Sequence, residues 1–196
     1  MFIVIEMKTE ILWEQLIDKG LEHLILDQGA QIVAEGLVVG MLKDVAYRVQ
    51  YQIVCDVKWN TQKVSVKDLL SRKEFVLTRS GNEWLDEQNQ AIESLRGCTD
   101  VDIRVTPFTN TLPIKRLSLK PGEAEEIAVV YVNVPELSLS KFGQRYTCLS
   151  KDKDGGIYKY ESLDSGFTSE LKVDAEGLVL DYPGIFKLVW KRTQGN

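Results

Sequence analysis

The clearest pattern along the chain is an alternation of apolar and polar positions from residue 45 to residue 59. Every second residue is apolar, and most of the residues between them carry charged or amide side chains. A period of two predicts a β-strand with one face in the core and the other in water. Fifteen residues at about 3.3 Å each would span roughly 50 Å, so such a strand must coil or bend to remain packed. The pattern therefore indicates a strongly curved antiparallel sheet.

Further apolar segments follow, separated by turn signals such as Ser80-Gly81-Asn82 and Asp154-Gly155-Gly156. They predict about a dozen strands in total. The additional strands are expected at residues 63–66, 74–78, 99–105, 127–134, 145–149, 157–161, 167–173, 178–181 and 185–190. No linker, repeat or low-complexity tract divides them, so residues 1–196 are expected to form a single domain.

Two segments carry helical signals. Thr106 and Pro107 are typical of a helix start, with Thr106 as the cap, Pro107 at the first helical position, and Pro113 expected to end the helix. Residues 12–21 also have apolar side chains at helical spacing, although Gly20 weakens that prediction.

Charge and hydropathy exclude several classes of partner. The chain has 44% hydrophobic residues and a net charge of −5 at pH 7, which repels phosphate backbones. Nucleic acid is therefore not an expected partner, and anionic membrane surfaces are disfavoured, whereas neutral lipid inside the fold is not. The longest purely apolar run, residues 2–5, is far shorter than the roughly 20 residues of a membrane span. Neither stable membrane insertion nor an export signal is expected.

Few residues are suited to metal or redox chemistry. Cys55, Cys98 and Cys148 are widely spaced and form no CxxC pair, which fits reduced thiols in the cytoplasm. His23 is the only histidine and is expected to be solvated or structural. The glycines form neither GxGxxG nor a phosphate-binding loop. We therefore expect no metal, no cofactor and no enzymatic activity.

Polar residues are concentrated just before and within the predicted helix. Asp100 and Asp102 stand two residues apart on a strand, so their carboxylates share a face about 7 Å apart, as paired acid and base groups can. The ordinary explanation is alternating charge on a solvated face. The wider cluster has two interpretations: an internal hydrogen-bond network that anchors the helix against the sheet, or polar contacts to a ligand headgroup. It comprises Asp100, Asp102, Arg104, Thr106, Thr109, Asn110, Lys115 and Arg116.

Aromatic residues, among them Trp59 and Tyr146, are distributed over most of the predicted strands. Most are expected in the core. A sheet that curls around itself can nevertheless enclose more volume than its side chains fill, and aromatic walls then suit an acyl chain or a sugar face.

One long segment carries a family resemblance. Residues 97–117 read GCTDVDIRVTPFTNTLPIKRL, which resembles the signature of the putative glycolipid-binding family, the spiral β-roll proteins. Supporting pieces occur in the expected order and extend the resemblance over nearly the whole chain. They include Trp13, Gly20 with Glu22, Tyr51 with Cys55-Asp56, Gln144 to Thr147, Phe167, and Asp181-Tyr182-Pro183.

The resemblance implies an all-β, mainly antiparallel fold: a spiral β-roll of about 15 strands wrapped around a single α-helix, in a protein that forms homodimers. We expect that helix near residues 106–112. For residues 12–21 the family pattern indicates strand and loop, and we prefer it to the helical spacing.

The functional hypothesis is non-catalytic binding of a lipid or glycolipid, with acyl chains in the interior of the curled sheet. An apolar cavity of several hundred cubic ångströms that opens to solvent would distinguish it. The alternatives are a homodimeric interaction or structural module without a small-molecule ligand, and a carboxylate-dependent enzyme that uses Asp100 and Asp102. The candidate ligand-binding residues are Trp59, Asp100, Asp102, Thr106, Thr109, Asn110, Arg116 and Tyr146.

Overall fold

The computed structural model describes residues 7–17 and 19–195 of the chain. The apolar run at residues 2–5 lies outside the described residues. Within the part that is described, no helix is long and apolar enough to cross a membrane.

The described residues form one 14-stranded sheet in the order β7-β6-β5-β4-β3-β2-β1-β14-β13-β12-β11-β10-β9-β8. The strands are β1 (Met7–Gln15), β2 (Gly20–Gln28), β3 (Ile32–Leu42), β4 (Val45–Cys55), β5 (Thr61–Asp68), β6 (Glu74–Ser80), β7 (Glu83–Leu85), β8 (Asp100–Ile103), β9 (Ala124–Asn133), β10 (Ser138–Lys151), β11 (Gly155–Ser162), β12 (Thr168–Asp174), β13 (Val179–Tyr182) and β14 (Phe186–Gly195). A 3₁₀ turn, η1 (Glu93–Leu95), lies between β7 and β8.

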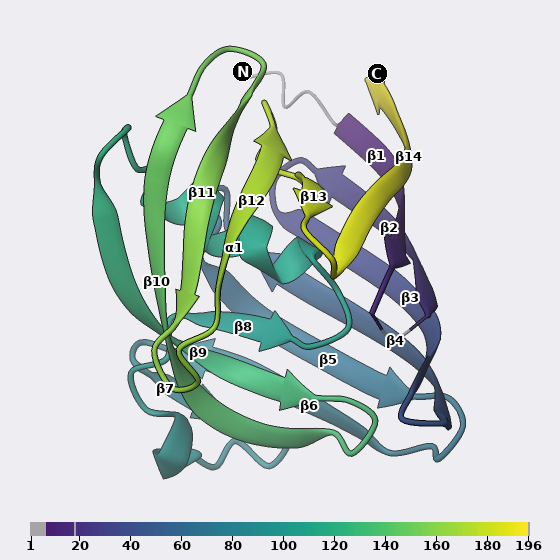
Figure 1. Ribbon diagram of the computed structural model, residues 1–196. Coiled ribbons are helices and arrows are strands. Elements are labelled where there is room, and N and C mark those ends of the chain that lie inside the picture. The colour runs from purple at the N-terminus through teal and green to yellow at the C-terminus, as the bar shows by residue number, and fades with distance from the viewer. Residues whose placement is uncertain (1–6, 18, 196) are drawn as a thin grey trace.

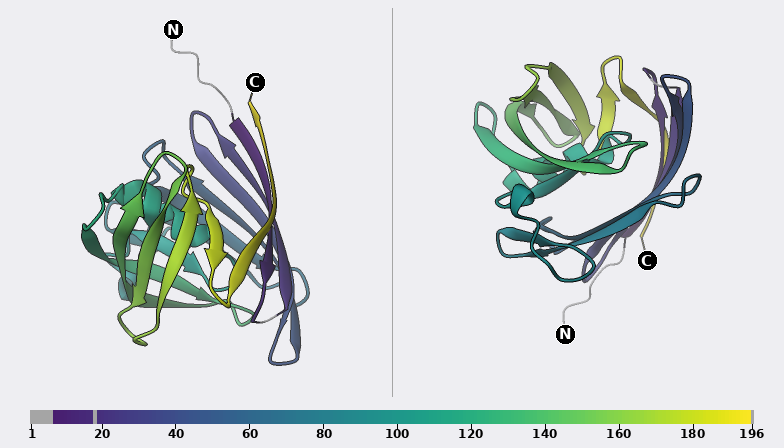
Figure 2. Two further views of the ribbon diagram at one scale, coloured as in Figure 1. Left: turned by 45° about the horizontal axis from the view of Figure 1, so that its top comes forward. Right: turned by 90° about the horizontal axis from the view of Figure 1, so that it is seen from below.

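The sheet curls until its two halves face each other, with α1 (Phe108–Leu117) between them (Figures 1 and 2). Strands β1 to β7 form one wall, and β9 to β13 form the other. Strand β14 joins the walls by pairing with β1 on one side and β13 on the other. The end strand β8 lies inside the roll against β5. The prediction of an all-β sheet rolled around one helix is confirmed.

The helix is a consequence of how β8 pairs. All neighbouring strands are antiparallel except β8 and β9, which are parallel. Parallel neighbours cannot be joined by a tight hairpin and need a crossover connection, and α1 provides it. Phe108 and Leu112 pack into the large core cluster with Trp13 and Trp84, whereas Ile114 packs with Tyr158 and the second wall. Apolar side chains of α1 thus pack against both walls and fill the space between them.

Two expectations from the sequence are corrected. The strand predicted at residues 45–59 ends at Cys55. The Asp56 carboxylate accepts hydrogen bonds from the backbone N–H groups of Lys58 at 2.8 Å and Asn60 at 3.0 Å, which closes a turn. Trp59 lies in that turn with a φ of 66° and its side chain is still buried. The period-two pattern continues through the turn by coincidence.

The helix also runs further than expected. Pro113 lies inside α1 and does not end it; the helix continues to Leu117 and is capped by Ser118 in the left-handed conformation. Leu112 and Ile114 on either side of the proline are buried between the walls, and this packing offsets the lost backbone hydrogen bond. At residues 12–21 the strand-and-loop prediction is confirmed, because β1 ends at Gln15 and β2 begins at Gly20.

Candidate functional site

A pocket of about 380 Å³ opens to solvent between the β1–β2 and β11–β12 connections. Its lining is aromatic on the walls and polar where β8 and the start of α1 meet it. The aromatic residues are Tyr131, Phe142, Tyr160, Phe167, Tyr182 and Phe186; the others are Gln15, Ile17, Asp102, Arg104, Thr106, Asn110, Ser162, Ser165 and Ile185.

The aromatic wall results from the registers of neighbouring strands. Tyr131 on β9 stands opposite Ser140, so Phe142, two residues further along β10, is its diagonal neighbour on the same face. Their rings stack with centroids 4.5 Å apart and an interplanar angle of 9°. Tyr182 pairs directly with Phe186, and Phe186 pairs with Gln15 of β1.

Tyr182 is the centre of the second aromatic group. Its ring centroid lies 6.2 Å from that of Tyr160, 6.4 Å from Phe167 and 6.1 Å from Phe186. These are the tilted and edge-to-face contacts that aromatic rings favour. Phe167 is 43% exposed, whereas Tyr182 and Phe186 are largely buried, so Phe167 forms the accessible edge of the group.

Asp102 is the carboxylate in the pocket. Its Oδ2 accepts a hydrogen bond from Gln144 Nε2 at 2.6 Å, and its Oδ1 accepts one from Thr109 Oγ1 at 3.2 Å. Burial raises the pKa of Asp102 above its ordinary value, although these two hydrogen bonds lower it. Each carboxylate oxygen holds a further lone pair, so the group can still accept hydrogen bonds from a ligand.

Hydrogen bonds to residues outside the pocket lining fix the side chain of Asn110. Its Oδ1 accepts a hydrogen bond from Tyr146 Oη at 2.9 Å, and its Nδ2 donates to the carbonyl of Pro107 at 3.2 Å. Gln144 Nε2 also donates to Tyr160 Oη at 3.2 Å. The side chains beneath the pocket are therefore fixed by β10, β11 and the first turn of α1, and the polar floor is preorganised.

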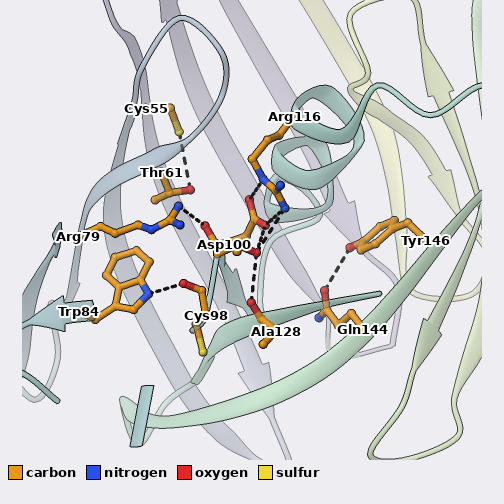
Figure 3. A network of polar contacts seen from close by, with 11 residues as sticks. Cys55, Thr61, Arg79, Trp84, Cys98, Asp100, Arg116, Ala128, Gln144 and Tyr146 are labelled. Atoms are coloured by element: carbon orange, nitrogen blue, oxygen red, sulfur yellow. Dashed lines mark hydrogen bonds and ion pairs between the residues drawn. The ribbon is translucent and has the colours of Figure 1, made fainter. Parts of the chain in front are cut away.

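Asp100 belongs to a different network, shown in Figure 3. Its carboxylate is fully buried and receives two hydrogen bonds from Arg116, from Nε at 3.1 Å and from Nη2 at 2.5 Å. Thr99 Oγ1 donates to Asp100 Oδ2 at 2.9 Å, and Arg79 donates to the Thr99 carbonyl at 3.0 Å. This network anchors the last turn of α1 to β8 and β6, as the internal-network interpretation predicts. The solvated-face explanation for the two aspartates is wrong for Asp100.

A second buried carboxylate lies behind the pocket. Glu22 of β2 accepts hydrogen bonds at Oε1 from Thr106 Oγ1, at 2.8 Å, and from Tyr51 Oη. Burial raises the pKa of Glu22 to about 8. Its Oε2 has no hydrogen-bond partner among the described residues. The Tyr51 ring reaches Glu22 across β3 because position 36 is glycine; a Cβ there would lie 2.2 Å from the ring.

The structure separates the candidate residues into three groups. Asp102, Thr106 and Asn110 line the pocket. Thr109 and Tyr146 hydrogen-bond to those residues from outside the lining. Asp100, Arg116 and Trp59 do not line the pocket: Asp100 and Arg116 pair with each other, and the Trp59 ring has Lys115 Nζ at 5.6 Å from its centroid.

Sequence reasoning missed most of the aromatic wall and Glu22. Phe167, Tyr182 and Glu22 are all part of the strings that carry the family resemblance, but none was selected as a site residue. The inward direction of Glu22 follows from strand parity once the bounds of β2 are known. That of Tyr182 does not, because Val179 and Tyr182 are both buried at the two ends of β13, whose pairing with β12 is irregular, and Phe167 precedes β12. The proximity of the three missed residues to β8 follows only from the curl of the sheet.

The remaining reactive residue types lie elsewhere. His23 is exposed on the outer face of β2, as expected for a solvated histidine. Cys55, Cys98 and Cys148 are free and buried, and burial raises the pKa of Cys55 to about 12 and that of Cys98 to about 11. Over residues 7–17 and 19–195 no group of three metal-ligating side chains was found.

Comparisons with known proteins give one family model and a similar solved structure. The family model described as "Putative glycolipid-binding" matches residues 10–188. Among solved structures, a DUF1089 family protein from Pseudomonas aeruginosa is similar, with 32% sequence identity and a TM-score of 0.77 over 87% of this chain and 92% of that chain. A search of the curated proteins found no match.

Proposed function

Because the chain belongs to the putative glycolipid-binding family, we propose that it binds a glycolipid without catalysis and holds the sugar head in the aromatic pocket. One observation carries this proposal: aromatic rings on β9 to β14 converge with the hydrogen-bonding groups of Asp102, Thr106 and Asn110 in one pocket.

This combination suits a sugar. A pyranose has apolar C–H faces, which pack on aromatic rings, and a rim of hydroxyl groups, which need donors and acceptors. Tyr182 and Phe167 offer the rings, and Asp102 offers a fixed acceptor. The volume, about 380 Å³, lies within the usual range of small-molecule sites.

The proposal departs from the initial hypothesis in where the acyl chain lies. Phe108 and Leu112 of α1 are fully buried between the two walls, so side chains occupy the centre of the roll. An acyl chain would have to displace this core, which is unfavourable in a close-packed interior. We therefore place the sugar head of the ligand, and not its acyl chain, inside the roll.

Binding without chemistry is part of the proposal. Among the described residues, Asp102 is the single carboxylate in the pocket lining. Asp100, which would be its partner in acid and base work, is neutralised by Arg116 and does not line the pocket. A pair of carboxylates flanking one glycosidic bond is the usual requirement for its hydrolysis.

A carboxylate-dependent enzyme is the second candidate, favoured by the raised pKa of Asp102 in a ligand-sized pocket. Prolonged incubation with octyl glucoside separates the two functions. Release of free glucose that is lost in Asp102→Asn would establish catalysis, whereas recovery of the intact glycoside supports binding alone.

The test of binding is native mass spectrometry of the purified protein, first as isolated and then with octyl glucoside, octyl galactoside, octyl phosphocholine and octanoate. We expect at least one glycoside to bind at one molecule per chain, and octanoate not to bind. Binding of octanoate or phosphocholine in preference to every glycoside would overturn the sugar-head assignment. The same spectra test the homodimer that the family resemblance implies. The buried free cysteines fit a reducing compartment, so the cytoplasm is our proposed location.

A further inference from the structure

A second, open groove of about 700 Å³ lies on the outer face of the sheet, beside the pocket. Its apolar side chains are Leu16, which directly follows β1, and Leu21, Val39 and Val189, which lie on β2, β3 and β14; Glu14 and Lys19 also line it. The four apolar side chains are between 42% and 57% exposed. Side chains that are this apolar and this exposed normally occur singly, so their gathering on one surface indicates a binding function.

The registers of the strands explain why these residues gather. Leu21 and Val39 are direct cross-strand partners on β2 and β3. Both have the parity opposite to that of buried Glu22 and Val38, so they face outward. On β14 the register with β1 shifts between Leu12 and Trp13, and the unpaired residue at this bulge is Val189.

The groove and the pocket meet at the end of β1. Gln15 lines both of them. The next residue, Leu16, lines the groove, whereas Ile17 lines the pocket and is 65% exposed. An apolar path therefore runs from the mouth of the pocket over Ile17 and Leu16 to the outer face.

We propose that this outer groove binds the hydrocarbon chain of the lipid whose head occupies the pocket. The inference rests on the proposed function. A head bound in the pocket must send its chain out through the mouth, because α1 fills the roll behind it. Contact with water is unfavourable for that hydrocarbon chain. The groove offers it apolar side chains that are continuous with the pocket lining at Leu16 and Ile17. A hydrocarbon chain is preferred to a protein partner as the occupant because of this continuity.

The experiment is a titration of n-alkyl glucosides from butyl to nonyl, each below its micelle concentration, by isothermal calorimetry. Full burial of a methylene group raises affinity about fourfold, so a chain buried on one side should gain about twofold per methylene. We expect that increase in the parent protein. In the double variant Leu21→Gln/Val39→Thr the increase should disappear, while the affinity for butyl glucoside stays within about twofold of the parent.

The matched control is Leu70→Gln/Val57→Thr, which makes the same two substitutions at exposed residues outside the groove. It should keep the chain-length increase. Val189→Thr is a second groove variant, to be used if the double variant does not fold. It should reduce the increase in affinity with chain length.

Several outcomes would overturn the inference: a parent affinity that is independent of chain length, or an increase that persists in both groove variants. If the parent protein is a dimer that dissociates in the groove variants, while the affinity still increases with chain length, the groove would be assigned to contacts with a second copy of the protein. Failure of the proposed function is a different result, in which butyl glucoside does not bind the parent or binds Phe167→Ala equally well. In that case the groove assignment also falls.

Discussion

Arg116, in the last turn of α1, makes a two-point ion pair with Asp100 at the start of β8, with Nη2 and Oδ2 2.5 Å apart. The Asp100 side chain is completely buried and that of Arg116 is 16% exposed. The pair therefore fixes the C-terminal end of α1, and neither of its residues lines the pocket.

Replacing Arg116 should therefore destabilise the protein and not act on ligand binding directly. In Arg116→Ala, the uncompensated Asp100 should lower the free energy of unfolding by about 3 to 5 kcal/mol in urea denaturation. The double variant Asp100→Leu/Arg116→Met, which removes both charges, should recover most of that loss. A loss below about 1 kcal/mol together with weakened glycoside binding would instead support the headgroup role considered from the sequence.

Glu22 should make stability depend on pH. Its folded pKa of about 8 exceeds the ordinary value of 4.5, so the folded state binds one more proton than the unfolded state between these values. The contribution of Glu22 to stability is then greatest below about pH 4.5 and falls as pH rises towards 8, at up to about 1.4 kcal/mol per pH unit. Glu22→Gln should remove this slope in denaturation experiments from pH 5 to pH 8.

The control for that experiment is His23→Gln, which removes the only histidine of the chain. His23 follows Glu22 directly in the sequence, but its side chain is exposed on the outer face of β2, away from the buried carboxylate. The slope should therefore persist in His23→Gln, and its loss there would assign the pH dependence to the histidine.

Phe167 should contribute to binding more than to stability. It is 43% exposed at the edge of the aromatic group, so Phe167→Ala should change the free energy of unfolding by less than about 1.5 kcal/mol. Loss of a ring that packs on a sugar face should weaken octyl glucoside binding roughly tenfold, as measured by calorimetry. Val57→Ala, a change at a residue that is 63% exposed and does not line the pocket, should leave the affinity unchanged.

Asp102 should make binding depend on pH in the opposite direction to stability. An ionised carboxylate is the better acceptor for sugar hydroxyls, and burial moves its pKa above the ordinary value. Binding of octyl glucoside should therefore weaken as pH falls through that pKa. Above that pKa, Asp102→Asn should bind less tightly than the parent protein, and its binding should show no such pH dependence. Asp27→Asn, at an exposed acid on the outer face of β2, should behave like the parent.

The strands were the predictable part of the fold, because alternation of apolar and polar residues reports directly on which side of a sheet is buried. The helical spacing at residues 12–21 has a physical cause. Trp13 is buried in the core, whereas Leu16 and Leu21 are apolar side chains on the outer face. Apolar residues on both faces of a strand obscure its period, and here the outer ones line the groove.

The division of roles between Asp100 and Asp102 was not predictable from the pattern. Both have the same parity on β8 and both contact α1, but Asp102 meets Thr109 near the start of the helix and Asp100 meets Arg116 near its end. Which aspartate faces the pocket is decided by the position of the helix in the roll. Likewise, Tyr160 and Phe186 come from separate strands and gather only through the curl of the sheet.

The place of β14 in the strand order has a consequence for how the protein forms during synthesis. Strands β1 to β7 and β9 to β13 each pair among themselves, but the two walls become one continuous sheet only when β14 inserts between β1 and β13. Strand β14 is translated after the other thirteen, so until then β1 presents an unpaired edge. The nascent chain must keep that edge from pairing with a neighbouring molecule until residues 186–195 leave the ribosome. A truncation before residue 186 would leave the pocket without Phe186 and the groove without Val189.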